Sequence, residues 1–197
     1  LSEADFYFIL TNDDSIEEIR KKIKTKNGMI LHSSGTKGKD SLSNHLNFGV
    51  FYPLQTFSFN KKIDFTRTPI LIEGDSKKSL EKLKELCQKL ELEFEEVNSE
   101  KRLHYHLAAS FANNFTNHIL SLTDELINKF KLEKKFFIPI ANETFKKFQS
   151  NKSKESQTGP AVRNDVKTLK KHEEILKKSN YLNLYKIITK SIKKNDL

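Results

Sequence analysis

The chain has 197 residues and a mass of 22.9 kDa, with 36% hydrophobic residues, 31% charged residues and a mean hydropathy of −0.62. This length suits one large domain or two small ones and is enough to bury a core. The sequence has no window of ~18 uncharged apolar residues, so no membrane span is predicted, and its opening residues lack the pattern of a secretory signal. The single cysteine, Cys87, excludes an intrachain disulfide framework and fits a reducing compartment. We therefore expect a globular, cytoplasmic protein with no membrane partner.

The net charge of +9 falls in the second half of the chain. Residues 1–98 carry 15 Lys and Arg against 16 Asp and Glu, whereas residues 99–197 carry 20 against 10. A basic half of this kind can attract nucleic acid, an anionic membrane or a phosphorylated small molecule. Because no known nucleic-acid-reading motif accompanies the lysines, we expect a small anionic partner and no nucleic acid. Lysine-rich solvent faces without a partner are the plainer alternative.

The first half of the chain alternates apolar runs with amphipathic stretches. An apolar run at 4–10 predicts a buried strand, and a capping box with Ser15 as N-cap and Glu18 three residues later predicts a helix to about Lys24. Asn27-Gly28 then turns the chain into a second strand at 29–32. Similar patterns predict strands at 48–52, 69–73 and 94–97 and helices near 39–45 and 80–90. This alternation predicts an α/β fold with a doubly wound parallel sheet.

From Lys101 onward the strand signals stop and helical patterns take over. Helices are predicted at about 101–130, 140–149, 161–178 and 182–193. The chain therefore divides into a predicted α/β domain at 1–98 and an all-α domain at 99–197. Because the first strand looks like a central one, we expect the doubly wound sheet to be partial and to lack its opening unit. The alternative is a small sheet that begins at Ala4.

The segment between Arg102 and Asp124 contains 21 consecutive residues without Asp, Glu, Lys or Arg. Such a segment predicts a helix enclosed by protein on most sides. At ~100° per residue, polar groups gather within one arc and apolar groups take the opposite side as a predicted core face. The polar arc holds His106, Ser110, Asn113, Asn114, Asn117 and Ser121, and the apolar side holds Ala108, Phe111, Ala112, Phe115, Ile119 and Leu122. Each polar group needs a partner, which is either neighbouring backbone, a partner subunit, or a polar ligand in a cleft.

No metal site is predicted from the histidines of this segment. His104 and His106 point to different faces of the predicted helix, whereas His104 and His118 share a face but lie ~21 Å apart along its axis. No helical carboxylate completes a ligand set.

Several motifs, which follow one another along most of the chain, carry a resemblance to a known family. These motifs are Asp13-Asp14-Ser15-Ile16, Leu31-His32-Ser33-Ser34-Gly35, Pro53-Leu54-Gln55-Thr56-Phe57, Tyr105-His106-Leu107-Ala108-Ala109 with Ala112-Asn113-Asn114-Phe115, and Thr158-Gly159-Pro160-Ala161 with Arg163 and Asp165. The chain resembles the Rossmann-like oxidoreductases with a C-terminal helical domain of unknown function, which are relatives of pyrroline-5-carboxylate reductase and the hydroxyacid dehydrogenases. The resemblance implies a Rossmann domain followed by a helical domain like that of 6-phosphogluconate dehydrogenase. It also implies a homodimer formed through the helical domains, with NADP or NAD bound in an interdomain cleft.

The predicted roles of single residues follow from strand ends and from this resemblance. Ligands of open α/β sheets lie at the carboxyl ends of strands, so the predicted cofactor-binding residues are Thr11, Asn12, Asp13, Ser33 and Ser34. The predicted catalytic residues are Ser110, Asn114 and His32, whose imidazole suits proton transfer near neutral pH. The predicted binding residues for a small anionic substrate are Asn113, Arg163, Asp165 and His172. The alternatives are a plain turn at 11–13, a His32 satisfied by backbone, and an interdomain salt bridge for Arg163, which is predicted in the first turn of a helix.

The sequence departs from the family pattern at three places. It contains no G-x-G-x-x-G turn for the cofactor's pyrophosphate. Tyr52 stands where the family usually shows His, and Ser110 stands where the hydroxyacid dehydrogenases have Lys, with Asn114 in their Asn position. Two functions are therefore predicted as alternatives: an NAD(P)-dependent oxidoreductase that acts on a small anionic metabolite, and a non-catalytic nucleotide-binding or dimerisation module.

Overall fold

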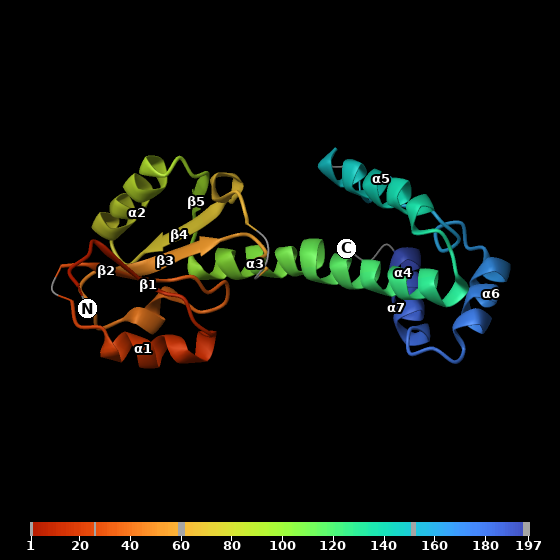
Figure 1. Ribbon diagram of the computed structural model, residues 1–197, viewed down its shortest axis with the longest axis horizontal. Helices are drawn as coiled ribbons and strands as arrows, with labels where there is room; N and C mark the ends of the chain where they lie inside the picture. The colour runs from red at the N-terminus through yellow and green to blue at the C-terminus, as the bar shows by residue number, and fades with distance from the viewer. Residues whose placement is uncertain (1, 26, 59–61, 151–152, 195–197) are drawn as a thin grey trace. The chain divides into compact units, whose positions relative to one another are not determined.

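The computed structural model describes residues 2–25, 27–58, 62–150 and 153–194. The chain forms two compact units, Leu1–Thr123 and Asp124–Leu197, which are described one at a time below. Unit 1 contains a sheet with flanking helices and the first part of a long helix, and unit 2 is helical (Figure 1). The predicted order of an α/β part followed by an all-α part is confirmed.

In the described residues, the sheet of unit 1 has five strands in the order β1-β2-β3-β4-β5. The strands are β1 (Phe6–Ile9), β2 (Met29–His32), β3 (Phe48–Pro53), β4 (Ile70–Gly74) and β5 (Phe94–Glu96), all within a few residues of the predicted ranges. The pairs β1–β2, β2–β3 and β4–β5 are parallel, whereas β3–β4 is antiparallel. The predicted α/β fold is confirmed with a mostly parallel sheet, in which β3–β4 is the antiparallel pair. A parallel pair needs a crossover, usually a helix, and the described part of the 54–69 connection contains only the 3-10 turn η3 (Phe65–Arg67).

Two helices cover opposite faces of this sheet, α1 (Ile16–Lys22) on one and α2 (Lys77–Lys89) on the other (Figure 1). Alternate residues of β2 point to opposite faces, so Ile30 packs with Ile16 of α1, while Met29 and Leu31 pack with Leu83 of α2. All of these side chains are buried. Cys87 lies in the second of these cores, where burial raises the pKa of its thiol to about 11.

Ser15 is the N-cap residue of α1, as predicted, but the capping box predicted there is wrong. Residues Asp13–Ser15 form a 3-10 turn, η1, directly before α1, so Ser15 already has helical backbone angles and its side chain makes no capping hydrogen bond. The helix predicted near 39–45 is likewise a single 3-10 turn, η2 (Lys39–Leu42). A 3-10 turn thus takes the place of the first α-helical turn before α1 and of the whole short helix predicted near 39–45.

A nearly continuous helix follows the sheet, as predicted for 101–130, but it contains a π turn. It consists of α3 (Ser99–Ala109), the π-helical turn η4 (Ser110–Phe115) and α4 (Thr116–Phe130). The side chain of Asn98 caps its start by accepting from the Lys101 N–H at 2.7 Å. Because a π turn closes i→i+5 hydrogen bonds, residues beyond it no longer follow the ~100° step from α3. The single polar arc predicted across this segment is therefore interrupted at Ser110–Phe115.

The expectation that this helix is enclosed by protein is wrong for a single copy of the chain. Leu107 is 56% exposed, Phe111 62% and Phe115 53%, and only toward the end of the uncharged segment does Leu122 become buried. The apolar side therefore forms an open ridge instead of the predicted core face. The rings of Phe111 and Phe115 pack edge to face with centroids 4.9 Å apart, so they cover each other in part.

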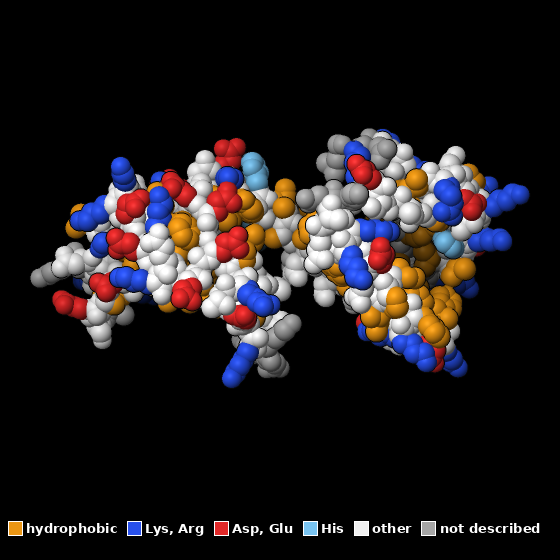
Figure 2. All heavy atoms as spheres, turned by 90° about the horizontal axis from the view of Figure 1, so that it is seen from above, with side chains coloured by type: hydrophobic (Ala, Val, Ile, Leu, Met, Phe, Trp, Pro, Cys, Tyr) orange, Lys and Arg blue, Asp and Glu red, His pale blue; other side chains and the backbone are white. Residues whose placement is uncertain are grey.

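Unit 2 consists of the end of α4, the 3-10 turn η5 (Lys134–Phe136) and the helices α5 (Ile138–Gln149), α6 (Val166–Leu176) and α7 (Leu182–Lys194). Helix α6 begins at Val166 and not at the predicted residue 161, because Asp165 caps it by accepting from the Thr168 N–H at 3.1 Å. Figure 2 shows hydrophobic side chains open to solvent on unit 2, bordered by Lys and Arg. None of the helices in the described residues is long and apolar enough to cross a membrane.

Candidate functional site

The carboxyl ends of the three parallel strands β1, β2 and β3 meet at one edge of the sheet. Thr11 follows β1, Ser33 follows β2 and Tyr52 lies near the end of β3, and all three line one cavity of about 580 Å³. Its other lining residues are mostly apolar: Phe8, Ile9, Leu10, Phe51, Pro53, Gln55, Phe57, Phe65, Leu86 and Leu90. Ligands of open α/β sheets bind at this edge, and an apolar pocket with a few polar groups is the usual form of a small-molecule site.

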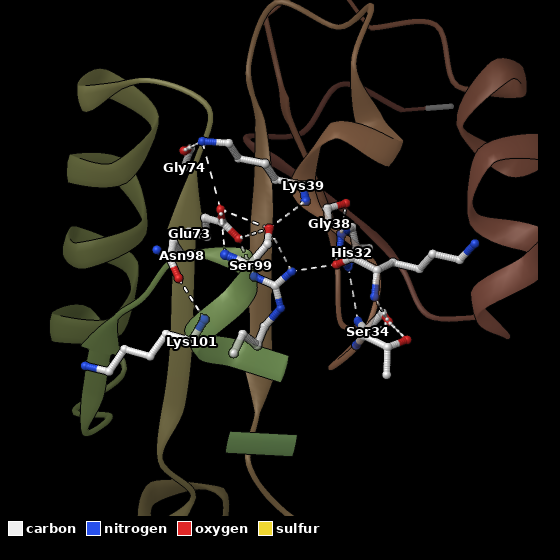
Figure 3. Close-up of polar contacts among 12 residues, drawn as sticks. His32, Ser34, Gly38, Lys39, Glu73, Gly74, Asn98, Ser99 and Lys101 are labelled. Carbon is white, nitrogen blue, oxygen red and sulfur yellow. Dashed lines mark hydrogen bonds and ion pairs between the residues drawn. The ribbon is translucent and has the colours of Figure 1, made fainter. Parts of the chain in front are cut away.

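The loop after β2 is held in shape by His32, which is fully buried. Its Nδ1 accepts a hydrogen bond from the Ser34 N–H at 3.1 Å, and its Nε2 lies 3.3 Å from the Gly38 carbonyl oxygen (Figure 3). This pair of contacts requires the neutral ring with the proton on Nε2. Burial, and then the positive charge of Arg102, lower the pKa of His32 to about 4, so the ring is neutral near pH 7.

Ser34 and Asp13 connect this loop to the turn after β1. The Ser34 hydroxyl accepts hydrogen bonds from the Thr36 N–H at 3.1 Å and from the Lys37 N–H at 2.9 Å. Thr36 in turn donates its hydroxyl to an Asp13 carboxylate oxygen at 2.5 Å. Burial disfavours the charged form of Asp13, but hydrogen bonds from Thr36 and Ser34 outweigh it and hold the pKa of that carboxyl below its usual value. Two of the predicted cofactor-binding residues are thus brought together by a third side chain.

A buried ion pair anchors the same loop to β4 and to the start of α3. Arg102 has no exposed surface, and its guanidinium pairs with the carboxylate of Glu73. The other end of the guanidinium donates to the Lys37 carbonyl oxygen at 2.5 Å. Ser99 completes the cluster by donating its hydroxyl to a Glu73 carboxylate oxygen at 2.8 Å (Figure 3). The loop between Ser34 and Lys39 is therefore held from both the sheet and the helix.

Tyr52 and His106 form a second link between the sheet edge and α3. The Tyr52 hydroxyl lies 3.0 Å from His106 Nδ1, and the two rings meet edge to face. A side chain on Gly35 would put its Cβ 2.6 Å from His106 Nδ1, so the loop and the imidazole are in close contact. Half-burial raises the pKa of the Tyr52 hydroxyl.

The remaining predicted cofactor-binding residues lie at the same edge, and the hydroxyls among them donate to backbone carbonyl oxygens. Ser33 donates its hydroxyl to the Phe51 carbonyl oxygen of β3 at 2.9 Å. Thr11 and Asn12 are exposed, and the Thr11 hydroxyl donates to the Asn12 carbonyl oxygen at 3.2 Å. Their side chains are thus available at the rim of the site.

The predicted catalytic and substrate residues of the long helix lie at the π turn. The Ser110 hydroxyl donates to the His106 carbonyl oxygen at 3.1 Å, whereas Asn113 and Asn114 are exposed. π turns occur frequently at functional sites, so this position is compatible with the predicted roles. Those roles stay predictions.

Arg163, Asp165 and His172 belong to unit 2. Arg163 lies in the turn before α6 and not in its first helical turn, because Asn164 adopts a positive φ of 50° and Asp165 is the N-cap. Hydrogen bonds from the Thr168 hydroxyl and N–H lower the pKa of Asp165. His172 lies with its Nδ1 2.9 Å from the Tyr185 hydroxyl. Their predicted roles in substrate binding also stay predictions.

Several residues of this site had no assigned role in the sequence. Tyr52 was noted only as a departure from a family pattern, and Thr36, Glu73 and Ser99 carried no signal. The scarcity of arginine singles out Arg102, since the chain has only four: Arg20, Arg67, Arg102 and Arg163. The pairing of Arg102 with Glu73, 29 residues earlier, depends on the tertiary structure.

Comparisons with known proteins agree with this architecture. Residues 68–192 match the model of a family described as a domain of unknown function (DUF2520). The chain belongs to this family. The crystal structure of a candidate NADP oxidoreductase from Bacteroides fragilis aligns with 97% of this chain and 76% of its own length, at 32% identity and a TM-score of 0.89.

Two further solved structures share the fold at lower identity. A protein from Thermotoga maritima aligns with 95% of this chain and 76% of its own, at 22% identity and a TM-score of 0.73. Prephenate dehydrogenase from Aquifex aeolicus aligns with 98% of this chain and 77% of its own, at 18% identity and a TM-score of 0.50. No curated protein matches the chain. The comparisons thus support an NAD(P)-dependent oxidoreductase-like fold.

Proposed function

We propose that this protein is an NAD(P)-dependent oxidoreductase that acts on a small anionic metabolite. The observation that carries the proposal is the meeting of Thr11, Ser33 and Tyr52 at one edge of the sheet, where all three line the same cavity. The 32% identity to a candidate NADP oxidoreductase over nearly the whole chain supports it. The oxidoreductase fold by itself does not specify an activity, so the proposal depends on this edge.

The residues present fit the nicotinamide end of such a cofactor. A cavity of about 580 Å³ with aromatic and aliphatic walls suits a planar ring, and the hydroxyls of Thr11 and Ser33 suit its amide. Asn12, Asp13 and Ser34 would border the adjoining ribose. The cofactor, when bound, supplies or accepts a hydride. The sequence contains no G-x-G-x-x-G turn, so no pyrophosphate-binding role is assigned to its residues.

The proposed substrate-binding residues are polar residues that follow the sheet in the chain. Ser110, Asn113 and Asn114 would orient the substrate, and the guanidinium of Arg163 would hold its anionic end, with Asp165 and His172 nearby in the sequence. We assign His32 the role of shaping the loop as well as its predicted catalytic role. Both of its ring nitrogens already contact loop backbone.

Cofactor titration tests the proposal directly. NADPH, NADH and reduced nicotinamide mononucleotide are titrated into the protein, and nicotinamide fluorescence is followed. The mononucleotide is included because it needs no pyrophosphate turn. We expect saturable binding that Thr11→Trp weakens by at least about tenfold, or ~1.4 kcal/mol, since the new ring would fill the cavity rim. Thr144→Trp, at a matched exposed threonine of α5, should bind as the wild type does. Absence of binding by all three nucleotides would contradict the proposal.

A second function, dimerisation, is favoured by the open apolar ridge of the long helix. We propose that Leu103, Leu107, Phe111 and Phe115, each more than 40% exposed, pack against a second copy of the chain. Contiguous exposed apolar side chains on a folded protein usually mark an interface. A chain that dimerises through this ridge and binds no nucleotide would be the non-catalytic module.

A further inference from the structure

We propose that Ser99 and Arg102, at the start of α3, are positioning residues for the proposed cofactor site. They set the path of the loop that follows β2, residues 33–39, and this loop in turn places the carboxylate of Asp13. The inference rests on the proposed function, because the loop carries Ser33 of the same sheet edge. Neither positioning residue belongs to the predicted catalytic, cofactor-binding or substrate-binding sets.

One face of α3 follows this loop for two helical turns. Ser99, Arg102 and His106 are three and four residues apart, a spacing that puts their side chains on one face of the helix. The Ser99 hydroxyl accepts a hydrogen bond from the Lys39 N–H at 3.3 Å. The Arg102 guanidinium donates to the Lys37 carbonyl oxygen at 2.5 Å. The helix and the loop therefore run in opposite chain directions along these contacts.

His106, the third residue of this face, packs against the loop at Gly35. A Cβ on Gly35 would lie only 2.6 Å from His106 Nδ1, so the imidazole leaves the loop no room to move toward the helix here. Together the three helix residues contact every second position of the loop, at 35, 37 and 39. The path of the loop thus depends on where α3 lies.

Glu73 of β4 fixes the same helix face to the sheet. Its carboxylate pairs with the Arg102 guanidinium and accepts from the Ser99 hydroxyl at 2.8 Å and from the Ser99 N–H at 3.1 Å (Figure 3). Glu73 and Arg102 are both buried. The sheet therefore sets the position of α3, and α3 passes this position on to the loop.

Placement explains an arginine at position 102 better than stability does. A buried ion pair often adds no net stability over apolar side chains of similar volume. In addition, Arg102 Nε has no hydrogen-bond partner among the described residues, although it is buried. A planar guanidinium does, however, donate in fixed directions, and here it reaches both Glu73 and the Lys37 carbonyl oxygen. A lysine would supply the charge without this geometry.

The loop passes its position to residues that the proposed function places beside the cofactor's ribose. Thr36 lies between two of the anchored positions and donates its hydroxyl to the Asp13 carboxylate at 2.5 Å. The Ser34 hydroxyl accepts from the N–H of Lys37 at 2.9 Å, and Arg102 holds the carbonyl oxygen of this same lysine. Release of the loop from α3 would therefore separate Thr36 from Asp13 and displace Ser34.

Nucleotide affinity in a pair of matched variants tests the inference. Arg102→Lys keeps a positive charge beside Glu73 but lacks the second donor arm that reaches the loop. We expect it to weaken the binding of reduced nicotinamide mononucleotide about tenfold, because Asp13 is no longer held in place. Arg67→Lys, the same substitution at an exposed ion pair with Asp64, should bind as the wild type does.

A double-mutant cycle shows whether Arg102 acts through the loop. Thr36→Val removes the hydroxyl that contacts Asp13 and leaves α3 unchanged. In the Thr36→Val background, Arg102→Lys should weaken binding by less than about twofold, because the contact that it disturbs is already gone. Equal losses of affinity in both backgrounds would overturn the inference.

The titration of Asp13 gives a readout that a purely structural role would not move. Burial raises the pKa of this carboxyl, but hydrogen bonds and nearby charges from four residues outweigh it and hold the pKa below its usual value: Thr36, Ser34, His32 and Lys37. Arg102→Lys should therefore raise the pKa of Asp13. The pH dependence of the Asp13 carboxyl carbon resonance measures it by NMR, with Asp13→Asn used for assignment.

The outcomes separate this inference from the proposed function. Wild-type affinity, or an unchanged pKa of Asp13, in Arg102→Lys would overturn the inference. Absence of nucleotide binding by the wild type, with the pKa of Asp13 raised in Arg102→Lys, would identify failure of the proposed function alone. Where circular dichroism shows that Arg102→Lys does not fold, Ser99→Ala takes its place with the same deciding outcomes. This variant removes the hydroxyl that joins Glu73 to the Lys39 N–H.

Discussion

Burial and backbone contacts fix the charge state of His32 at the sheet edge. His32 and Arg102 are both fully buried, but their partners differ. Arg102 pairs with the carboxylate of Glu73, whereas the contacts of His32 are to backbone groups that match a neutral ring. A protonated His32 would lose its acceptor nitrogen and add a second positive charge beside Arg102. The loop conformation therefore depends on a neutral His32.

Stability should fall as the pH drops below the ordinary pKa of histidine. The pKa of His32 is about 4 in the folded protein and ~6.5 in the unfolded chain, so between these values the unfolded state binds more protons. Stability from this group is fully present above pH ~6.5 and is lost toward pH ~4. We expect the unfolding free energy to fall by about 2 kcal/mol between pH 7 and pH 5 through this group. Urea unfolding followed by circular dichroism measures the unfolding free energy at each pH. The His32→Asn variant should lose most of this pH dependence. Equal pH dependence in both proteins would contradict the prediction.

Removing one partner of the buried ion pair should be costly. Arg102→Met leaves the buried Glu73 carboxylate with Ser99 and the more distant Lys39 as its remaining partners, and we expect a loss of about 3 kcal/mol of unfolding free energy. The double variant Arg102→Met/Glu73→Leu removes both charges and should recover most of that loss. Urea denaturation measures the unfolding free energies of the wild type, Arg102→Met and the double variant. A double variant as unstable as Arg102→Met would show that the loss comes from packing or from the Lys37 contact.

At the scale of elements, the π turn separates the part of the long helix that meets the sheet from the part that enters unit 2. Arg102 and His106 on α3 contact the sheet edge and its loop, and the π turn begins one helical turn later at Ser110. The Thr116 hydroxyl donates to the Phe111 carbonyl oxygen at 2.9 Å and so satisfies a backbone group within this turn. The exposed amides of Asn113 and Asn114 are presented by this local geometry.

Loss of the Thr116 hydroxyl should loosen the π turn. Thr116→Val keeps the branched shape of the side chain but removes the donor to Phe111, and we expect a loss of about 1 kcal/mol. Amide hydrogen exchange at 110–116 should become faster, which mass spectrometry after deuteration measures. Thr116→Ser, which retains the hydroxyl, is the control. Identical exchange in the two variants would show that the hydrogen bond does not support the turn.

At the scale of the whole molecule, the apolar ridge and the polar residues of the long helix are proposed to have different roles. The apolar ridge that includes Leu107 and Phe111 is open to solvent in the single chain, and Asn114 is exposed as well. Burial of apolar area drives association, so the ridge is the proposed dimer surface, while the polar residues at the π turn are proposed to serve the substrate.

Substitutions on these two sides distinguish the roles. We expect the wild type to sediment as a dimer, Phe111→Glu to sediment as a monomer because a charge would be buried in the interface, and Asn114→Leu to remain dimeric. Analytical ultracentrifugation measures the oligomeric state of the wild type and of both variants. Circular dichroism confirms that each protein stays folded. The opposite result, with dimers lost only in Asn114→Leu and nucleotide binding intact, would favour the polar side as the subunit interface.

Much of the architecture was predictable from local patterns. The apolar run Met29–His32 and the uncharged segment after Arg102 predicted a strand and a long helix that the structure contains. Such elements depend on hydrophobic periodicity and turn residues, which act over a few positions. The placement of Thr11 and Ser33 after strands was predictable for the same reason, and parallel pairing then brings their positions to one edge.

Other features were decided by contacts between residues far apart in the chain. The antiparallel β3–β4 pair, the exposed side of the long helix and the buried pair of Arg102 with Glu73 all depend on which elements pack together. Periodicity indicates that a face is apolar, but it does not indicate whether another element covers it. Likewise, the sequence shows a Tyr and a His 54 residues apart, and only folding brings the Tyr52 hydroxyl to 3.0 Å from His106 Nδ1. Local sequence determined the elements of this protein, whereas tertiary packing decided the protonation of His32 and the partner of Tyr52, because desolvation and hydrogen bonding depend on neighbours in space.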